Sequence, residues 1–141
     1  MKSLCPHLVL FLLTIGSTLF IGGPIYALSL LTILAAHEMG HYLASRKYGV
    51  PSSLPYFIPF PLPPFGTLGA VIRSKGQIPH REALFDIGSW GPLFGLALAI
   101  PAVVGGLLLS EVTDVSRLPA HSMSLGNSPL FSLLQGMALG G

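Results

Sequence analysis

Charged side chains are what this sequence has least of. Asp, Glu, Lys and Arg make up 9% of its 141 residues, whereas a typical soluble domain has roughly 25%. No charged residue occurs in the ranges 3–37, 48–72 and 87–110, and apolar stretches of that length are typical of membrane-embedded segments. The composition therefore excludes an ordinary soluble surface and predicts a chain that lies mostly in lipid.

Cysteine and clustered basic residues are also scarce. Cys5 is the only cysteine, which excludes a disulfide framework and a four-cysteine zinc site within one chain. The net charge is +2, and no Lys/Arg stripe with interleaved aromatic residues occurs, so nucleic acid is not an expected partner. With no internal repeat, the chain is expected to form one domain over residues 1–141.

Three apolar segments are candidates for membrane helices. The first, residues 7–22, is shorter than the roughly 20 residues that span a bilayer, and a signal peptide is its alternative interpretation. The pair Gly22-Gly23 is expected to end it, and Pro24 suits the first turn of a second helix that runs to residue 46 or 47. A third helix is expected from residue 80 or 81 to about residue 110.

The segment between the second and third helices differs from both. Residues 51–64 contain six prolines, which exclude a helix and predict an extended, partly buried piece. Residues 66–76, GTLGAVIRSKG, read as a strand or short hairpin at the interface or against protein. The predicted fold class is an all-α polytopic membrane protein with about three transmembrane helices, a proline-rich interfacial loop and a short β hairpin.

The positive charges indicate an orientation. Most of them fall in the segment between the second and third helices, which is therefore expected to face the cytoplasm; they are Arg46, Lys47, Arg73, Lys75 and Arg81. Lys2 agrees with this orientation, because a helical hairpin returns to its starting side. Asp114 and His121 are then expected on the far side.

One stretch of the second helix is unusually polar for a membrane segment. Its sequence HEMGH places His37 and His41 four residues apart, so both imidazoles lie on one helix face and can bind one metal ion. Neutral imidazoles suit Zn²⁺, and Glu38 is placed to hold a metal-bound water and take its proton. Counted from Arg46, the two histidines lie roughly 7 and 13 Å below the surface.

The low chance expectation of the HExxH pattern and the free energy of zinc binding both favour a metal site. An HExxH pattern is expected by chance about four times in a thousand chains of this composition. A carboxylate at the bilayer centre costs on the order of 3 kcal/mol, whereas structural zinc releases on the order of 10 kcal/mol on binding. A hydrogen-bonded polar network between helices is the alternative interpretation.

A third ligand is harder to identify. Catalytic zinc normally has three protein ligands, and the two histidines supply only two. Asp86 is the one carboxylate in the chain expected at a similar depth, about 7 Å, although its place near a helix start also suits a capping or packing role. His80 and Glu82 are expected to be solvated groups at the interface.

HEMGHYLA in an apolar helix, a proline-rich loop, GTLGAVIRSKG and ALFDIGSWGPLFG come one after another in this order. The set resembles the site-2 protease family of intramembrane zinc metalloproteases, especially its bacterial, archaeal and chloroplast-like members without an inserted PDZ domain in this region. The likeness covers about residues 24–110. It implies that His37 and His41 bind zinc and that Glu38 is the general base.

The resemblance also concerns the third helix and the chain beyond it. It implies that Gly91, Pro92 and Gly95 mark the helix packed behind the site. The family takes its third zinc ligand from an Asp in a later helix, usually within Leu-Asp-Gly, and this tripeptide does not occur here. We therefore expect a member truncated before the third-ligand helix, with the C-terminal part of the family core missing, or a relative whose ligand comes from elsewhere.

The implied function is that of a zinc metalloendopeptidase that hydrolyses peptide bonds of transmembrane substrates. Its partners would be a single-pass membrane protein and the lipid bilayer. It would be a multi-pass protein of a bacterial-type plasma membrane or a chloroplast membrane, with the site near the cytoplasmic or stromal side. The alternatives are an inactive or incomplete relative that acts as a membrane interaction protein, and a small transporter or channel subunit.

Intramembrane proteolysis also requires an unwound substrate, and a free strand edge can pair with one. We hypothesise that residues 66–74 receive the substrate, and the alternative is a hairpin without a substrate role. The residues expected to bind the substrate are Gly66, Thr67, Leu68, Gly69, Ala70 and Val71.

Overall fold

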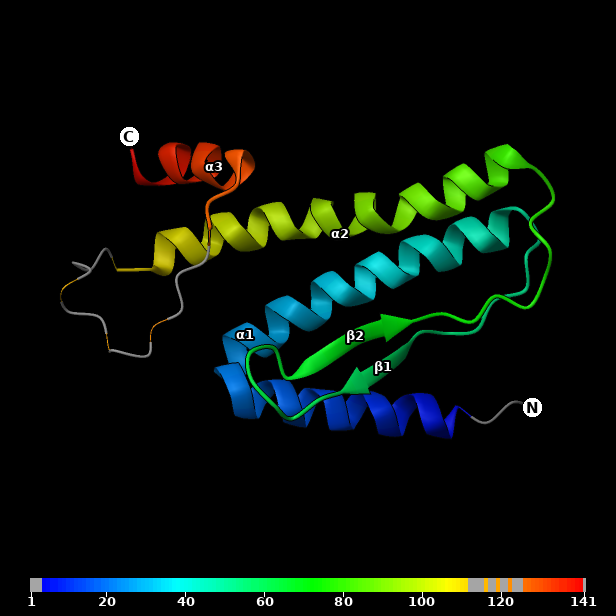
Figure 1. The fold of residues 1–141 in the computed structure, drawn as a ribbon, viewed down its shortest axis with the longest axis horizontal. Helices are drawn as coiled ribbons and strands as arrows, with labels where there is room; N and C mark the ends of the chain where they lie inside the picture. Colours follow the sequence, from blue (N-terminus) through cyan, green and yellow to red (C-terminus); the bar gives the residue numbers. More distant parts are fainter. Residues whose placement is uncertain (1–3, 112–115, 117–118, 120–121, 123–125, 141) are drawn as a thin grey trace. The chain divides into compact units, whose positions relative to one another are not determined.

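The computed structural model describes residues 4–111, 116, 119, 122 and 126–140. The chain divides into two compact units, Met1–Ala99 and Ile100–Gly141. Its helices and strands are α1 (Cys5–Lys47), β1 (Tyr56–Pro59), β2 (Thr67–Val71), α2 (Arg81–Leu109) and α3 (Pro129–Leu139) (Figure 1). Three residues used in the orientation prediction, Lys2, Asp114 and His121, lie outside the described residues.

Helix α1 consists of two helical segments that meet at Gly23. Gly23 has φ 78° and ψ −177°, a backbone conformation outside the helical region, which a residue with a Cβ adopts only with strain. Pro24 comes directly after it and so begins the second segment, where its missing N–H needs no partner. The chain turns back at this point, and the two halves of α1 run in opposite directions (Figure 1), so the predicted helix break is found where it was expected.

The chain is mostly helical, and two of its helices, α1 and α2, are long and apolar enough to cross a membrane. Helix α2 begins at Arg81 and ends at Leu109, within one residue of the predicted ends. The three-span arrangement, which counts each half of α1 as one crossing, stays a prediction.

The strands form a two-stranded antiparallel sheet. Tyr56 pairs with Val71 and Ile58 with Gly69, and an irregularity lies between Ile58 and Pro59. The strand predicted within residues 66–76 is therefore present, and its partner comes from the proline-rich segment. That segment can supply a strand because residues 56–58 lie between two of its prolines.

The tip of the hairpin is held between the two halves of α1. The hydroxyl of Ser17 donates to the carbonyl of Gly66 at 2.5 Å, and the hydroxyl of Tyr26 donates to the carbonyl of Phe65 at 2.8 Å. A Cβ on Gly66 would lie 3.0 Å from the Ser17 carbonyl oxygen and from the Cα of Thr18. The hairpin thus lies against protein, which was one of the two environments expected for it.

Small residues bring the first part of α2 against the C-terminal half of α1. A Cβ on Gly40 of α1 would overlap the backbone carbonyl of Trp90. Ala44 and Ala83 are both fully buried. Such small-residue contacts allow two apolar helices to approach closely, and here they place α2 directly behind the HEMGH segment.

Helix α3 belongs to the second unit. Ser128 caps its start by accepting a hydrogen bond from the backbone N–H of Phe131 at 3.1 Å, and Gly140 ends it in the left-handed conformation. Its 11 residues are fewer than the roughly 20 that span a bilayer.

Candidate metal centre

His37 and His41 face each other on successive turns of α1. Their Nε2 atoms are 3.1 Å apart, and their rings meet edge to face at 76°. Two imidazole nitrogens that bind one tetrahedral zinc ion at 2.0–2.1 Å are separated by about 3.3 Å. The observed separation, which is also a hydrogen-bond distance between the two rings, is therefore close to the one that a shared zinc ion requires.

The orientation of His41 is set by α2. Its Nδ1 lies 2.6 Å from the backbone carbonyl oxygen of Ile87, and a carbonyl only accepts hydrogen bonds, so Nδ1 carries the proton. The lone pair of the neutral ring is then on Nε2, the atom that faces His37. Most metal-binding histidines are oriented by such a partner on the other ring nitrogen.

Glycines of α2 make room for both imidazoles. A Cβ on Gly91 would overlap the ring of His41, and one on Gly95 would lie 3.2 Å from Nδ1 of His37. These two glycines therefore lie behind the site, as the resemblance implied. Pro92 is exposed and does not share this contact.

Glu38 comes directly after His37 and is largely buried. Its side chain is 7% exposed, in a helix whose other buried residues are small or apolar. Its predicted catalytic role stays a prediction, as does zinc binding by the two histidines.

Asp86 is bound elsewhere. Its carboxylate accepts hydrogen bonds from the Tyr48 hydroxyl at 2.5 Å and from Lys47 Nζ at 3.0 Å. It therefore joins the end of α1 to the start of α2, which agrees with the packing role expected for it. Among the residues that the structure describes, no group of three His, Cys, Asp or Glu side chains could hold a metal ion.

Two contributors to the site carried no signal in the sequence. The carbonyl of Ile87 is a backbone group, so its residue type says nothing about its role. Gly40 lies inside HEMGH, but its contact with Trp90 depends on how α2 packs. Only a known helix pairing would have identified either of them.

The predicted substrate-binding residues lie in the hairpin. Thr67 to Val71 form β2, and Gly66 precedes them at the turn. Thr67 is buried, and its hydroxyl donates to the carbonyl of Ile58 at 2.8 Å. Both strands contact α1, so the hairpin and the HEMGH segment share one helix as their support.

The sequence was also compared with known families and proteins. Residues 25–138 match peptidase family M50. The chain is 39% identical over 99 residues to the probable zinc metalloprotease EGY1, chloroplastic, of Oryza sativa subsp. japonica, an alignment that covers 67% of this chain and 17% of that protein. It is 36% identical over 116 residues to the protein of the same name from Arabidopsis thaliana, covering 81% of this chain and 21% of that protein.

A further relative is the probable zinc metalloprotease EGY2, chloroplastic, of Oryza sativa subsp. indica, which is 34% identical over 83 residues; the alignment covers 59% of this chain and 15% of that protein. No solved structure matches the chain. The chain spans about a fifth of the length of the curated relatives it matches. The family match covers most of the chain, including the histidine pair and both glycines behind it, and on this evidence the chain belongs to peptidase family M50, the site-2 zinc metalloproteases.

Proposed function

We propose that this chain carries the zinc-binding and general-base part of an intramembrane protease that cleaves single-pass membrane proteins. His37 and His41 hold the zinc ion, and Glu38 is the catalytic base. The observation that supports this most directly is the 3.1 Å approach of the two Nε2 atoms, beside a buried carboxylate, in a helix apolar enough to cross a membrane.

The roles proposed for these residues agree with their positions. The Ile87 carbonyl keeps the proton on Nδ1 of His41, so the neutral ring can act as a ligand. Bound zinc supplies a Lewis acid for water and for the scissile carbonyl. Glu38 takes the proton of the attacking water and returns it to the leaving amine.

The substrate is proposed to add as a strand to β2. Within the described residues, β2 pairs with β1 alone, so its other edge is available for a segment whose helix has unwound. Main-chain hydrogen bonds to β2 would hold the substrate backbone in an extended conformation. These bonds alone do not distinguish one substrate side chain from another. Residues 66–71 are the ones proposed to contact the substrate at this edge.

The proposed location is a bacterial-type plasma membrane or a chloroplast membrane. The three relatives named above carry "chloroplastic" in their names, and the family is membrane-embedded. The site is proposed to lie near the cytoplasmic or stromal side, because the end of α1 nearest His41 carries Arg46 and Lys47.

The decisive test compares Glu38→Gln with His37→Ala. The chain is produced in a membrane with a single-pass reporter, and zinc is measured in the purified protein. Glu38→Gln is expected to retain zinc and to lose cleavage by a factor of about 10²–10⁴, whereas His37→Ala loses both. A wild-type chain without zinc, or a Glu38→Gln variant that cleaves normally, would contradict the proposal.

The substrate edge has its own test. Successive N–H groups of a strand point to opposite edges, so proline at Ala70 and proline at Val71 remove a donor from opposite sides of β2. One variant weakens the β1–β2 pairing, and the other alters only the outer edge. The variant that keeps the thermal stability of the wild type is expected to bind zinc and to lose cleavage, and unchanged cleavage in both variants would exclude strand addition.

A second candidate function is supported by one observation. Within the described part of the chain only two zinc ligands are found together, which fits an inactive relative that acts as a membrane interaction protein. Zinc analysis separates the two candidates: the interaction protein lacks zinc in the wild type as well as in His37→Ala, and the protease lacks it only in the variant.

A further inference from the structure

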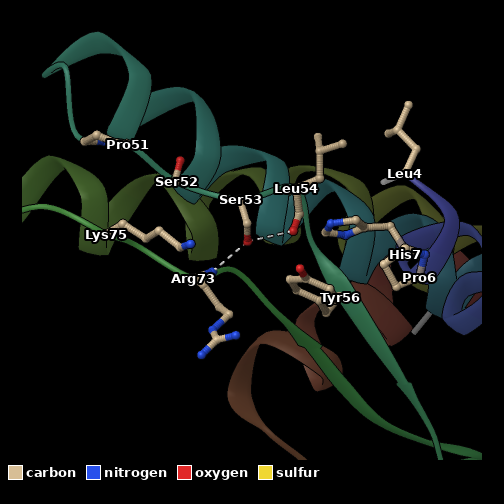
Figure 2. A pocket seen from close by; sticks show the side chains of 10 residues that line it. All are labelled: Leu4, Pro6, His7, Pro51, Ser52, Ser53, Leu54, Tyr56, Arg73 and Lys75. Carbon is tan, nitrogen blue, oxygen red and sulfur yellow. Dashed lines mark hydrogen bonds between the residues drawn. The ribbon is translucent and has the colours of Figure 1, made fainter. Parts of the chain in front are cut away.

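A polar cavity lies at the end of the first unit opposite the Gly23 turn. It has a volume of about 390 Å³ and is lined by the start of α1, the segment after α1 and the segment after β2. Figure 2 shows the ten side chains that line it, which include His7, Tyr56, Arg73 and Lys75. Two of the ten are cationic and none is acidic, so the cavity suits an anion.

Hydrogen-bond donors surround this cavity. The hydroxyl of Ser53, one of the lining residues, donates to the Leu54 carbonyl at 3.0 Å and accepts from the backbone N–H of Arg73 at 2.9 Å. Tyr56 and Arg73 also line the cavity, and the Arg73 side chain is exposed (Figure 2). His7 is held in place by its contact with the Pro55 carbonyl at 3.2 Å and by stacking on the Tyr56 ring at 3.9 Å.

An apolar groove between the two halves of α1 borders this cavity. A second cavity of about 470 Å³ shares Leu4, His7 and Leu54 with the polar one. A third, of about 410 Å³, shares Phe11 and Ala35 with the second. The third ends at Leu19 and Pro24, beside the turn of α1.

The groove changes character along its length. Its second part is lined by apolar side chains apart from His7. Its third part has Thr32 as its one polar lining residue, and the Thr32 hydroxyl already donates to the Leu28 carbonyl at 2.6 Å. A ligand that fills the groove therefore has one anionic end and a long apolar body.

The length agrees with a lipid. From Leu4 to Leu19 the helix rises about 22 Å, and one leaflet with its headgroup region is about 20–22 Å thick. We propose that the polar cavity and the apolar groove together bind one anionic membrane lipid, with its headgroup at Arg73 and Lys75 and an acyl chain between the two halves of α1. This site lies on the opposite side of the C-terminal half of α1 from the glycines that contact His37 and His41.

Charge decides between the available occupants. An apolar helix of a substrate would fill the groove but would bring no anion to Arg73. A soluble phosphate would satisfy the polar cavity but not the groove. An anionic lipid satisfies both, and each Lys or Arg near a membrane surface adds to its attraction.

The test is native mass spectrometry of the whole chain in detergent. The chain is titrated with phosphatidylglycerol, with phosphatidylcholine of the same acyl chains, and with inorganic phosphate. We expect phosphatidylglycerol to bind about tenfold more tightly than phosphatidylcholine. Inorganic phosphate at the same concentration should not displace it.

Two pairs of variants separate headgroup from tail. Arg73→Gln with Lys75→Gln should abolish the preference for phosphatidylglycerol, whereas Arg81→Gln, which removes a cation outside the cavity, should keep it. Ala35→Phe fills the junction of the two groove parts and should weaken both lipids, whereas Ala97→Phe, on an exposed position of α2, should not.

Several results would overturn the proposal. Equal affinities for the two lipids would exclude an anion-selective headgroup site. Displacement by inorganic phosphate would indicate that the cavity binds a soluble anion. Binding that survives Ala35→Phe unchanged would remove the tail groove. Displacement of phosphatidylglycerol by an uncharged transmembrane peptide, with Arg73 and Lys75 having no effect, would identify the groove as a helix-binding surface.

Discussion

The Nδ1 atom of His41 on α1 lies 2.6 Å from the backbone carbonyl oxygen of Ile87 on α2. Because of this contact, the ring that faces His37 is held by the packing of a second helix rather than by α1 alone. A ligand oriented in this way binds metal more tightly than a freely rotating one, and loss of such a partner typically lowers metal affinity about 10- to 100-fold. The helix pairing and the metal centre are therefore coupled.

The first prediction concerns that coupling. Gly91→Ala introduces a Cβ into the space of the His41 ring, so the ring must turn or α2 must move away. We expect zinc affinity to fall by about tenfold or more, as measured by competition with a coloured chelator. Gly88→Ala is the matched control, since a Cβ at Gly88 meets no atom within 4 Å. Wild-type affinity in Gly91→Ala would show that the two helices do not pack as described.

The second prediction concerns the tip of the hairpin. Gly66 and Gly69 both have positive φ, of 75° and 102°, so alanine at either position costs about 1–2 kcal/mol in backbone strain. A Cβ at Gly66 also presses on Ser17 and Thr18 of α1, whereas one at Gly69 meets nothing within 4 Å. Gly66→Ala should therefore be less stable than Gly69→Ala by about 1–3 kcal/mol.

Unfolding of both variants in mixed micelles by added sodium dodecyl sulfate measures this difference. The comparison largely cancels the backbone strain, because both substitutions carry it. Equal midpoints for the two variants would show that the hairpin tip does not lie against α1.

The third prediction concerns the end of α1. The hydrogen bond from the Tyr48 hydroxyl to the Asp86 carboxylate raises the pKa of Tyr48 above its ordinary value. The protonated phenol is thus favoured in the folded chain. Its contribution to stability is fully present below the ordinary pKa of about 10 and is lost as the pH rises through the raised pKa.

Phenolate absorbance at alkaline pH follows this titration, and Tyr48→Phe identifies which step belongs to Tyr48. In Asp86→Asn that step should move to lower pH. Glu82→Gln removes another carboxylate from the first turn of α2 and should leave the step in place. A Tyr48 step that stays in place in Asp86→Asn would assign its shift to another cause.

Local features of the chain were predictable because their physics is local. The break at Gly22-Gly23-Pro24 depends on the backbone freedom of one glycine and the missing N–H of one proline, and α1 turns there. The approach of His37 to His41 depends on a four-residue spacing within one helix. The ends of α2 follow from where its apolar run begins and stops.

Contacts between distant segments were not predictable in this way. The sequence indicated β2 but not its partner, because β1 lies among prolines that favour an extended chain without specifying what it pairs with. Asp86 was compatible with a zinc ligand and with a packing role, and its bonds to Tyr48 and Lys47 decided between them.

The sequence by itself determined that the chain is apolar, that it turns at Gly23, and that two imidazoles and a carboxylate lie close together on one helix. Spacing along a helix converts directly into direction in space, so no other part of the chain was needed. Only the tertiary structure decided that α2 supplies the Ile87 carbonyl and the space behind the rings. These contacts depend on a backbone carbonyl and on glycines that have no side chain. Residue types far apart in the sequence do not specify that such groups will meet.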